Sequence, residues 1–290
     1  MKKYFVISDM HSFYDEMISC LNKKGFDINN QDHILVVCGD MFDRGHKPLE
    51  VYKFLRGLPK ERRILIRGNH ETLLRELVER GHAEWHDESN GTYRTLFYLA
   101  GLDKDQITDD YYKQAFLGGE FDPLHEATLR KEYEEKLNSV FHTDIIKEIL
   151  AWIASDEWVN YWETDKYIFC HAWIPLSQQI DWNLSRKTGY LEVEAEFYRE
   201  DWRNATQTEW EDAMWFCPWK KAKEKLNQTG KTIVCGHWHT SDFYNNLTKQ
   251  RKGKYECPIF NSKRYKLIGL DACTVVSKQV NVLVLNEDEL

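Results

Sequence analysis

The chain has 290 residues, of which 42% are hydrophobic, and its formal net charge is −8. This length and composition indicate a soluble globular protein with one large domain or two small ones. No apolar run approaches the roughly 20 residues that span a bilayer, which excludes a membrane partner.

The amino terminus enters a predicted strand almost directly and does not resemble a signal peptide, so we predict a cytoplasmic location. The seven cysteines are scattered without a C-x-x-C pair, as is typical of a reducing compartment.

The acidic excess is confined to one segment. Residues 103–160 hold 14 acidic and 6 basic side chains, whereas the rest of the chain has 33 of each sign. A protein that binds long nucleic acid through its phosphates would show a basic stripe, so we do not expect long nucleic acid as a partner.

The first eighty residues alternate between apolar, β-branched runs and amphipathic helices. Strands are predicted at 2–8, 33–38 and 62–66, with helices at 13–24 and 48–57 between them. Short connections in such a β-α-β-α-β order favour right-handed crossovers around a mostly parallel sheet.

The alternation stops after residue 80. We interpret residues 81–143 as an acidic, helical insertion within a single domain of residues 1–290, and we hypothesise that it forms a lid. Further predicted elements are helices at 129–141 and 144–154, a hairpin at 158–170, and strands at 166–170, 231–235, 266–270, 273–277 and 280–285. The late strands predict a second sheet and an α/β or α+β fold.

Polar motifs follow the predicted strands. They are Asp9-x-His11, Gly39-Asp40-x-x-Asp43-Arg44-Gly45, Gly68-Asn69-His70-Glu71 and Gly236-His237-x-His239, and His171 follows the strand at 166–170. The carboxyl ends of strands in an open α/β sheet gather ligands at one rim. Carboxylate oxygens and imidazole nitrogens from separate segments are what two divalent metal ions require, so we predict a dinuclear site with Mn, Fe or Zn.

The residue types also predict catalytic roles. Asp40 suits a carboxylate shared by two cations, and Arg44 can bind two phosphoryl oxygens at once. His70 suits the acid that protonates the leaving oxygen, and Asp43 could orient its ring and raise its pKa. Arg44, Asn69 and His70 together form the predicted phosphate-binding set.

Structural alternatives exist for several of these residues. Asp43 and Arg44 could form an ordinary turn salt bridge, and His70 could be a helix-start histidine without a proton to give. The aromatic stretch 202–219 could stack a nucleobase, although packing in the core or at the rim is the more common role of such rings.

Residues 32–71 (DHILVVCGDMFDRGHKPLEVYKFLRGLPKERRILIRGNHE) resemble the calcineurin-like metallophosphoesterases, in particular the branch of phosphoprotein phosphatases and bacterial symmetrical diadenosine tetraphosphatases. Segments 166–175, 214–219, 232–239 and 268–285 extend the resemblance. It implies a four-layer α-β-β-α sandwich of two mixed β-sheets flanked by helices. It also implies that Asp9 and His11 bind the first metal, that Asp40 bridges both metals, and that Asn69, His171 and His237 bind the second.

The resemblance leaves His239 open, because many members of the wider family use a histidine there as a ligand and the phosphatase branch generally lacks it. Other departures are Ala172-Trp173 after His171, where the family has two glycines, and Leu270-Asp271-Ala272-Cys273 where it favours Asp-Thr-Gly. These departures argue against a phosphoprotein substrate, and Gly236-His237-Trp238 leans toward the dinucleoside polyphosphate group.

We therefore predict a phosphoesterase that hydrolyses phosphate monoesters or phosphoanhydrides by direct attack of a metal-bridging hydroxide. Its expected partner is a small phosphorylated substrate or a phosphoprotein. The alternatives are a nuclease or phosphodiesterase of the wider family and a non-catalytic metal-binding scaffold.

Overall fold

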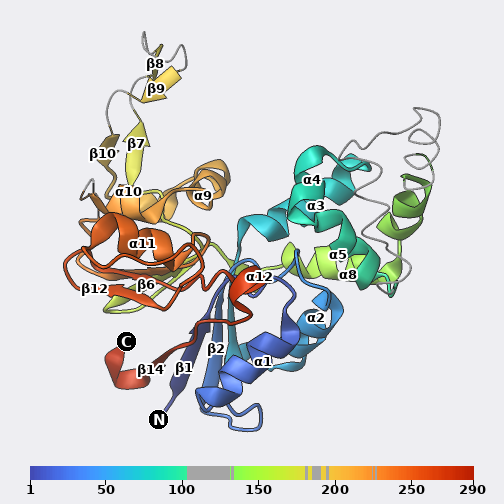
Figure 1. Ribbon diagram of the computed structural model, residues 1–290, viewed down its shortest axis with the longest axis horizontal. Helices are drawn as coiled ribbons and strands as arrows, with labels where there is room; N and C mark the ends of the chain where they lie inside the picture. The colour runs from blue at the N-terminus through green and yellow to red at the C-terminus, as the bar shows by residue number, and fades with distance from the viewer. Residues whose placement is uncertain are drawn as a thin grey trace.

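Two five-stranded sheets form the centre of the molecule in the computed structural model (Figure 1). The structure describes residues 1–102, 131, 134–179, 182–184, 191–193, 196–223, 225 and 227–290. The first sheet has the order β14-β1-β2-β3-β4, in which β1 to β4 run parallel and β14 is antiparallel to β1. Its strands are β1 (Lys3–Ile7), β2 (His33–Cys38), β3 (Arg63–Ile66), β4 (Trp158–Val159) and β14 (Leu283–Asn286).

The second sheet has the order β12-β13-β11-β6-β5. Its central strands β13, β11 and β6 are parallel, and the edge strands β12 and β5 are antiparallel to their neighbours. The hairpin predicted at 158–170 is present as β5 and β6. The strands are β5 (Tyr161–Glu163), β6 (Tyr167–Cys170), β11 (Thr232–Cys235), β12 (Phe260–Ser262) and β13 (Leu267–Gly269).

The two sheets pack against each other through one buried cluster, and helices cover their outer faces. Side chains alternate along β1, so that Val6 packs with Phe169 and Val234 of the second sheet. Phe5 and Ile7 instead pack under the helices of the first half of the chain. The resulting α-β-β-α layers confirm the predicted sandwich of two mixed sheets flanked by helices.

The helices over the first sheet contribute to one large core cluster. They are α1 (Tyr14–Lys23), α2 (Pro48–Gly57), α3 (Asn69–Arg80), α5 (Thr92–Leu99) and α8 (Asp144–Ile153). The short helix α4 (Trp85–Asn90) lies between α3 and α5 in the chain. The helices beside the second sheet are α9 (Gln207–Ala213), α10 (Pro218–Lys223) and α11 (Thr240–Leu247). Among the described helices, none is both long enough and apolar enough to cross a bilayer.

Two short antiparallel pairs project from the body on the side of the second sheet (Figure 1). In one pair β7 (Ser177–Gln179) lies beside β10 (Glu196–Tyr198), and in the other β8 (Trp182–Leu184) lies beside β9 (Leu191–Val193). The sequence analysis did not predict these strands.

The strand predicted at 273–277 is wrong, because this segment forms the short helix α12 (Thr274–Ser277). Cys273 has a φ of 52°, in the left-handed region, and its N–H donates to Asp271 Oδ1 at 2.7 Å. This turn ends the extended chain before the β-branched residues that suggested a strand. Thr274 instead donates its hydroxyl to the carbonyl oxygen of Asp9 at 2.9 Å.

The described part of the predicted insertion is helical. It comprises α4, α5 and helical residues 131 and 134–141. Residues 103–130, 132 and 133 lie outside the described residues, so the proposed lid and the single-domain boundary stay predictions.

Glu157 ties the segment after α8 to the first sheet. Its carboxylate accepts hydrogen bonds from Arg63 Nη2 at 2.5 Å and Trp152 Nε1 at 3.2 Å, and it pairs with Lys60 at 3.0 Å. Burial disfavours its charged form, but these partners outweigh that effect and lower the pKa of Glu157 to about 2. The carboxylate therefore stabilises the fold in its ionised form.

Replacing Glu157 by glutamine is expected to lower the free energy of unfolding by about 2 kcal/mol at pH 7, because Arg63 would lose a charged acceptor. A depressed carboxyl pKa stabilises the folded state above the ordinary value of 4.5, and this contribution is lost as the pH falls through about 2. Urea unfolding between pH 2 and pH 6 should show the variant and the unaltered protein converging at low pH, with exposed Glu50→Gln as control. A difference that stays constant with pH would contradict this assignment.

Candidate metal centre

The predicted ligands lie on sharp turns directly after the strands. Asp9, His11, Asp40 and His237 have φ values of 52°, 46°, 55° and 67°. Such left-handed conformations cost of order 1–3 kcal/mol each in residues other than glycine, and they persist only where the surrounding structure imposes them. Their concentration at the ends of β1, β2 and β11 marks this rim as a functional site.

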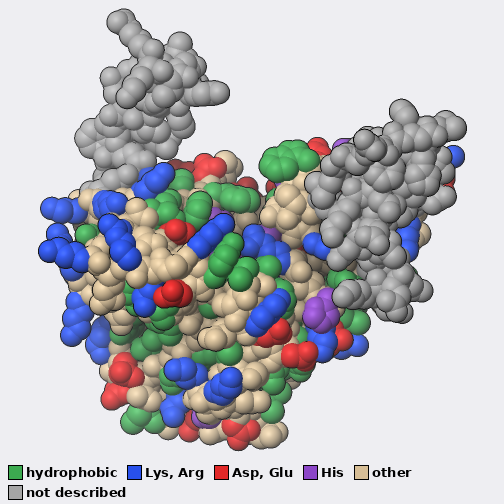
Figure 2. Space-filling model, viewed as in Figure 1, with side chains coloured by type: hydrophobic (Ala, Val, Ile, Leu, Met, Phe, Trp, Pro, Cys, Tyr) green, Lys and Arg blue, Asp and Glu red, His purple; other side chains and the backbone are tan. Residues whose placement is uncertain are grey.

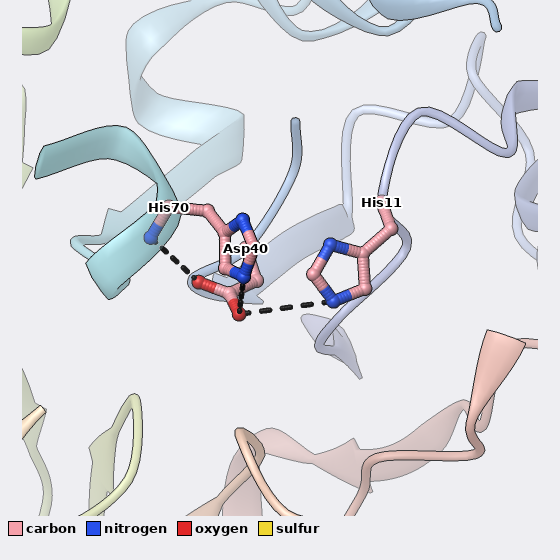
Figure 3. Close-up of side chains that lie close together, drawn as sticks. All are labelled: His11, Asp40 and His70. Atoms are coloured by element: carbon pink, nitrogen blue, oxygen red, sulfur yellow. Dashed lines mark hydrogen bonds and ion pairs between the residues drawn. The ribbon is translucent and has the colours of Figure 1, made fainter. Parts of the chain in front are cut away.

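Asp40 lies between two groups of potential ligands. In the first group, His11 Nε2 and His70 Nε2 each lie 3.8 Å from Asp40 Oδ2 (Figure 3). In the second group, His171 Nε2 lies 3.3 Å from Asp40 Oδ1 and 3.1 Å from His237 Nδ1. Each group of three could hold one metal ion, and Asp40 belongs to both. This is the arrangement expected of a carboxylate shared by two cations.

The protonation pattern of the histidines leaves lone pairs facing one another. His11 Nδ1–H donates to the carbonyl oxygen of Phe42 and His171 Nδ1–H to that of Cys38, each at 2.9 Å. In the neutral rings both Nε2 atoms are therefore unprotonated. His171 Nε2 also faces Asn69 Oδ1 at 2.8 Å. Lone pairs that converge without a proton between them fit a cation, so this donor set suits divalent metal ions.

The charges of the cluster agree with this fit. Burial opposes ionisation of Asp40, but the neighbouring imidazoles outweigh it and hold its pKa below the usual value. Burial, together with the adjacent His171, lowers the pKa of His237 to about 3. Burial also places the pKa of His11 well below its ordinary value, with Arg44 and His70 adding to the effect. At neutral pH an anionic Asp40 thus lies near the neutral rings of His11 and His237, and this is the protonation state in which such groups bind metal ions.

Asp43 and His70 form a buried pair beside the first group. His70 Nδ1–H donates to Asp43 Oδ2 at 2.6 Å, and Asp43 is fully buried. Burial disfavours the charged ring of His70, but Asp40 and the hydrogen bond to Asp43 outweigh it and raise the pKa of His70. Arg44 is exposed, and its Nη2 lies 3.5 Å from His70 Nε2. Asp43 thus faces His70, which disfavours the simple turn salt bridge with Arg44.

Residues 2–241 match the model of a protein family described as calcineurin-like phosphoesterase. The chain belongs to the calcineurin-like phosphoesterase family.

Two relatives of this phosphoesterase are tetraphosphatases by name. The symmetrical bis(5'-nucleosyl)-tetraphosphatase of Nitrosococcus oceani is 26% identical over 296 residues, which cover 98% of this chain and 94% of the relative. The asymmetrical bis(5'-nucleosyl)-tetraphosphatase PrpE of Bacillus subtilis is 29% identical over 133 residues, which cover 43% of this chain and 54% of PrpE. The phosphoesterase therefore spans about half the length of PrpE.

A solved structure shows the same fold. The cold-active protein-tyrosine phosphatase of a psychrophilic Shewanella species superposes with a TM-score of 0.52 at 15% identity, covering 99% of this chain and 76% of that one. At this identity the likeness concerns the fold alone.

Asp9 and His239 of the phosphoesterase lie outside both ligand groups found among the described residues. Both carboxylate oxygens of Asp9 accept from the backbone N–H of His237 at 3.0 Å. Burial raises the pKa of Asp9, with Asp271 and Asp40 adding to it. His239 is half-buried and directly precedes α11. The roles of Asp9 and His239 as ligands stay predictions.

Glu71, the last residue of the Gly68-Asn69-His70-Glu71 motif, was not predicted as a site residue. Glu71 is fully buried, and its carboxylate accepts from the backbone N–H groups of Asp40 at 3.0 Å, Met41 at 2.9 Å and Gly68 at 2.9 Å. Burial and the nearby Asp40 raise the pKa of Glu71 to about 7. The signal was a glutamate at the third position of α3, the capping-box position. Glu71 thereby fixes the turn that follows β2 and contains Asp40, here called the Asp40 turn, to the start of α3.

Two threonines from the predicted insertion were also missed. Thr92 Oγ1 donates to Asp43 Oδ2 at 2.7 Å, and Thr95 Oγ1 donates to Asp43 Oδ1 at 2.8 Å. Both lie in α5 and are fully buried. No local pattern could have indicated them, because they lie 49 and 52 residues from Asp43.

Glycines allow the loops to approach this closely. A Cβ on Gly39 would lie 2.7 Å from the Cα of Gly68 and closer still to the ring of His171. A Cβ on Gly68 would lie 2.8 Å from Glu71 Oε2 and closer still to Asp40. Real Cβ contacts of this kind do not occur, so any side chain at either position would push the Asp40 turn away from its ligands.

Proposed function

We propose that this phosphoesterase is a metal-dependent hydrolase of small phosphorylated nucleotides, with dinucleoside polyphosphates as the first candidates. The observation that carries the proposal is the position of Asp40, which belongs to both ligand groups and lies beside the Asp43–His70 pair. The names of the two tetraphosphatase relatives support the choice of a nucleotide substrate. The relatives give no support to the nuclease or scaffold alternatives.

The proposed cofactors are two divalent metal ions, with Mn, Fe or Zn favoured by the mixed carboxylate and imidazole ligands. His11 and Asp40 would hold the first ion, with Asp9 completing the set, and Asp40, Asn69, His171 and His237 would hold the second. When bound, such ions supply Lewis acidity and lower the pKa of water to near neutral.

The side chains beside the ions would perform the remaining steps. The exposed guanidinium of Arg44 would bind two phosphoryl oxygens and neutralise the charge that develops on them. His70 would protonate the departing oxygen from Nε2, and its raised pKa keeps that proton available near neutral pH. Asp43 holds the ring by the bond to Nδ1, and Thr92 and Thr95 hold Asp43.

Purified protein supplied with Mn²⁺ should hydrolyse diadenosine tetraphosphate, and EDTA should abolish the reaction. Chromatography of the products separates symmetrical cleavage, which gives two ADP, from asymmetrical cleavage, which gives ATP and AMP. A phosphopeptide, p-nitrophenyl phosphate and a DNA duplex should be assayed in parallel. Absence of turnover on every substrate with Mn²⁺, Fe²⁺ or Zn²⁺ would overturn the proposal, as would a kcat/KM that is highest for the phosphopeptide or the DNA.

A further inference from the structure

Three tryptophans are strongly exposed among the described residues, and two of them contact the same ligand histidine. Trp215 is 52% exposed and Trp238 is 36% exposed, whereas Trp85, 76% exposed, lies in α4. The ring of His237 meets Trp215 at a centroid distance of 5.6 Å and Trp238 at 5.4 Å, both nearly perpendicular. Exposed aromatic surface beside a polar cluster is typical of a ligand-binding site.

The support beneath these rings is rigid. Trp238 Nε1 donates to the carbonyl oxygen of Phe216 at 3.1 Å, and the Trp238 ring packs edge-on against buried Trp219 at 5.1 Å. The hydrogen bond from Trp238 to Phe216 connects the loop after β11 to the turn between α9 and α10. Trp215 lies in that turn. Trp215 is therefore held in place although half of its surface faces solvent.

The other tryptophans of the stretch 202–219 have a different role. Trp202, Trp210 and Trp219 are 1%, 4% and 8% exposed and belong to the core beneath the second sheet. The packing expected for this stretch applies to these three rings. Trp215 is the exception, and packing within the described residues does not account for its exposed face.

We propose that Trp215 is the stacking platform for the base of a nucleotide whose phosphate is bound at the metal cluster, with Trp238 as its support. This inference rests on the proposed function. His237 directs its Nδ1 toward His171 and Asp40 while its ring contacts Trp215, so a group attached to a phosphate in the cluster passes close to the indole. Figure 2 shows one face of the molecule, on which exposed hydrophobic side chains have Lys and Arg side chains among them.

Calorimetric titration of the Mn²⁺-loaded protein with ADP and with pyrophosphate tests the platform, because the two ligands share a diphosphate and differ in the nucleoside. The unaltered protein should bind ADP about tenfold more tightly than pyrophosphate. Trp215→Ala should abolish this difference and leave the affinity for pyrophosphate within about twofold. Trp215→Phe should keep most of the difference. Tyr255→Ala should keep all of it, because this ring is 45% exposed and lines a cavity that none of the proposed metal ligands lines.

Equal losses for ADP and pyrophosphate in Trp215→Ala would overturn the inference, as would unchanged affinities or an unaltered protein that does not prefer ADP. A preference for phenyl phosphate over ADP that depends on Trp215 would also overturn it and would indicate an aryl phosphate instead. Failure of the proposed function gives a different result. In that case the ADP preference and its loss in Trp215→Ala remain, but no phosphate substrate is hydrolysed.

Discussion

Replacing Asp40 by asparagine is expected to reduce kcat/KM by about 10³-fold or more and to prevent the protein from holding two metal ions at once. Asp40 is the one residue that belongs to both ligand groups found among the described residues, and its two oxygens face different histidines. An asparagine keeps the size of the side chain but offers one neutral oxygen. Two cations would then lie close together without an anion between them, and their repulsion would expel one.

Metal content measured after dialysis against Mn²⁺, together with kcat/KM for diadenosine tetraphosphate, tests this expectation. The matched control is Asp15→Asn, because Asp15 is 63% exposed and pairs only with Lys47 among the ion pairs of the described residues. The control should retain both ions and full activity. An Asp40→Asn protein that still carried two ions and turned over normally would show that Asp40 is not the shared ligand.

Replacing Glu71 by glutamine is expected to lower metal affinity and kcat/KM by about 10–100-fold, although Glu71 belongs to neither ligand group. Its two oxygens accept three backbone N–H groups. The one amide oxygen of a glutamine can accept only the hydrogen bonds that one carboxylate oxygen accepts now. Its NH₂ group would then face a backbone N–H that has lost its acceptor. Leaving a buried donor unpaired costs about 1–3 kcal/mol, so the Asp40 turn should shift or loosen.

The experiment must separate this positioning role from a general loss of stability. Mn²⁺ affinity should be measured by calorimetry at a temperature where urea titration shows the variant to be fully folded. Excess Mn²⁺ should then restore part of the activity of the folded variant, because a higher metal concentration compensates for the weaker site. Glu79→Gln is the control, since Glu79 lies in the same helix and is 66% exposed. Unchanged metal affinity in folded Glu71→Gln would contradict the positioning role.

Local patterns along the chain predict most of the strands that carry the site. Apolar, β-branched runs and helical spacing are local signals, and the strands β1, β2, β3, β6 and β11 lie where those signals predict them. The family resemblance supplied the two-sheet sandwich. His11, Asp40, His171 and His237 could be predicted as neighbours because each follows a strand, and the ends of parallel strands meet at one edge.

The local signal failed where a residue's conformation depends on a distant partner. Residues 274–277 have strand-like composition, yet Thr274 bonds to the backbone of Asp9, 265 positions away, and the segment is helical. The strand predicted at 280–285 begins only at Leu283, although Val280 and Val282 are buried in the core beneath the helices. β-branched composition predicted a strand in both places, and composition alone does not require one.

The groups that orient the predicted site could be identified only from contacts between distant elements of the fold. Thr92 and Thr95 hold Asp43 from a helix that the sequence placed in an insertion, and Trp215 is distinguished from its buried neighbours only by its exposure and its contact with His237. Spacing along the chain reports on neighbours within one strand or helix, because those geometries repeat with fixed periods. Contacts between separate elements have no such period. The sequence therefore could not predict the partners of Asp43, the backbone hydrogen bonds that Glu71 accepts, or the exposure of Trp215.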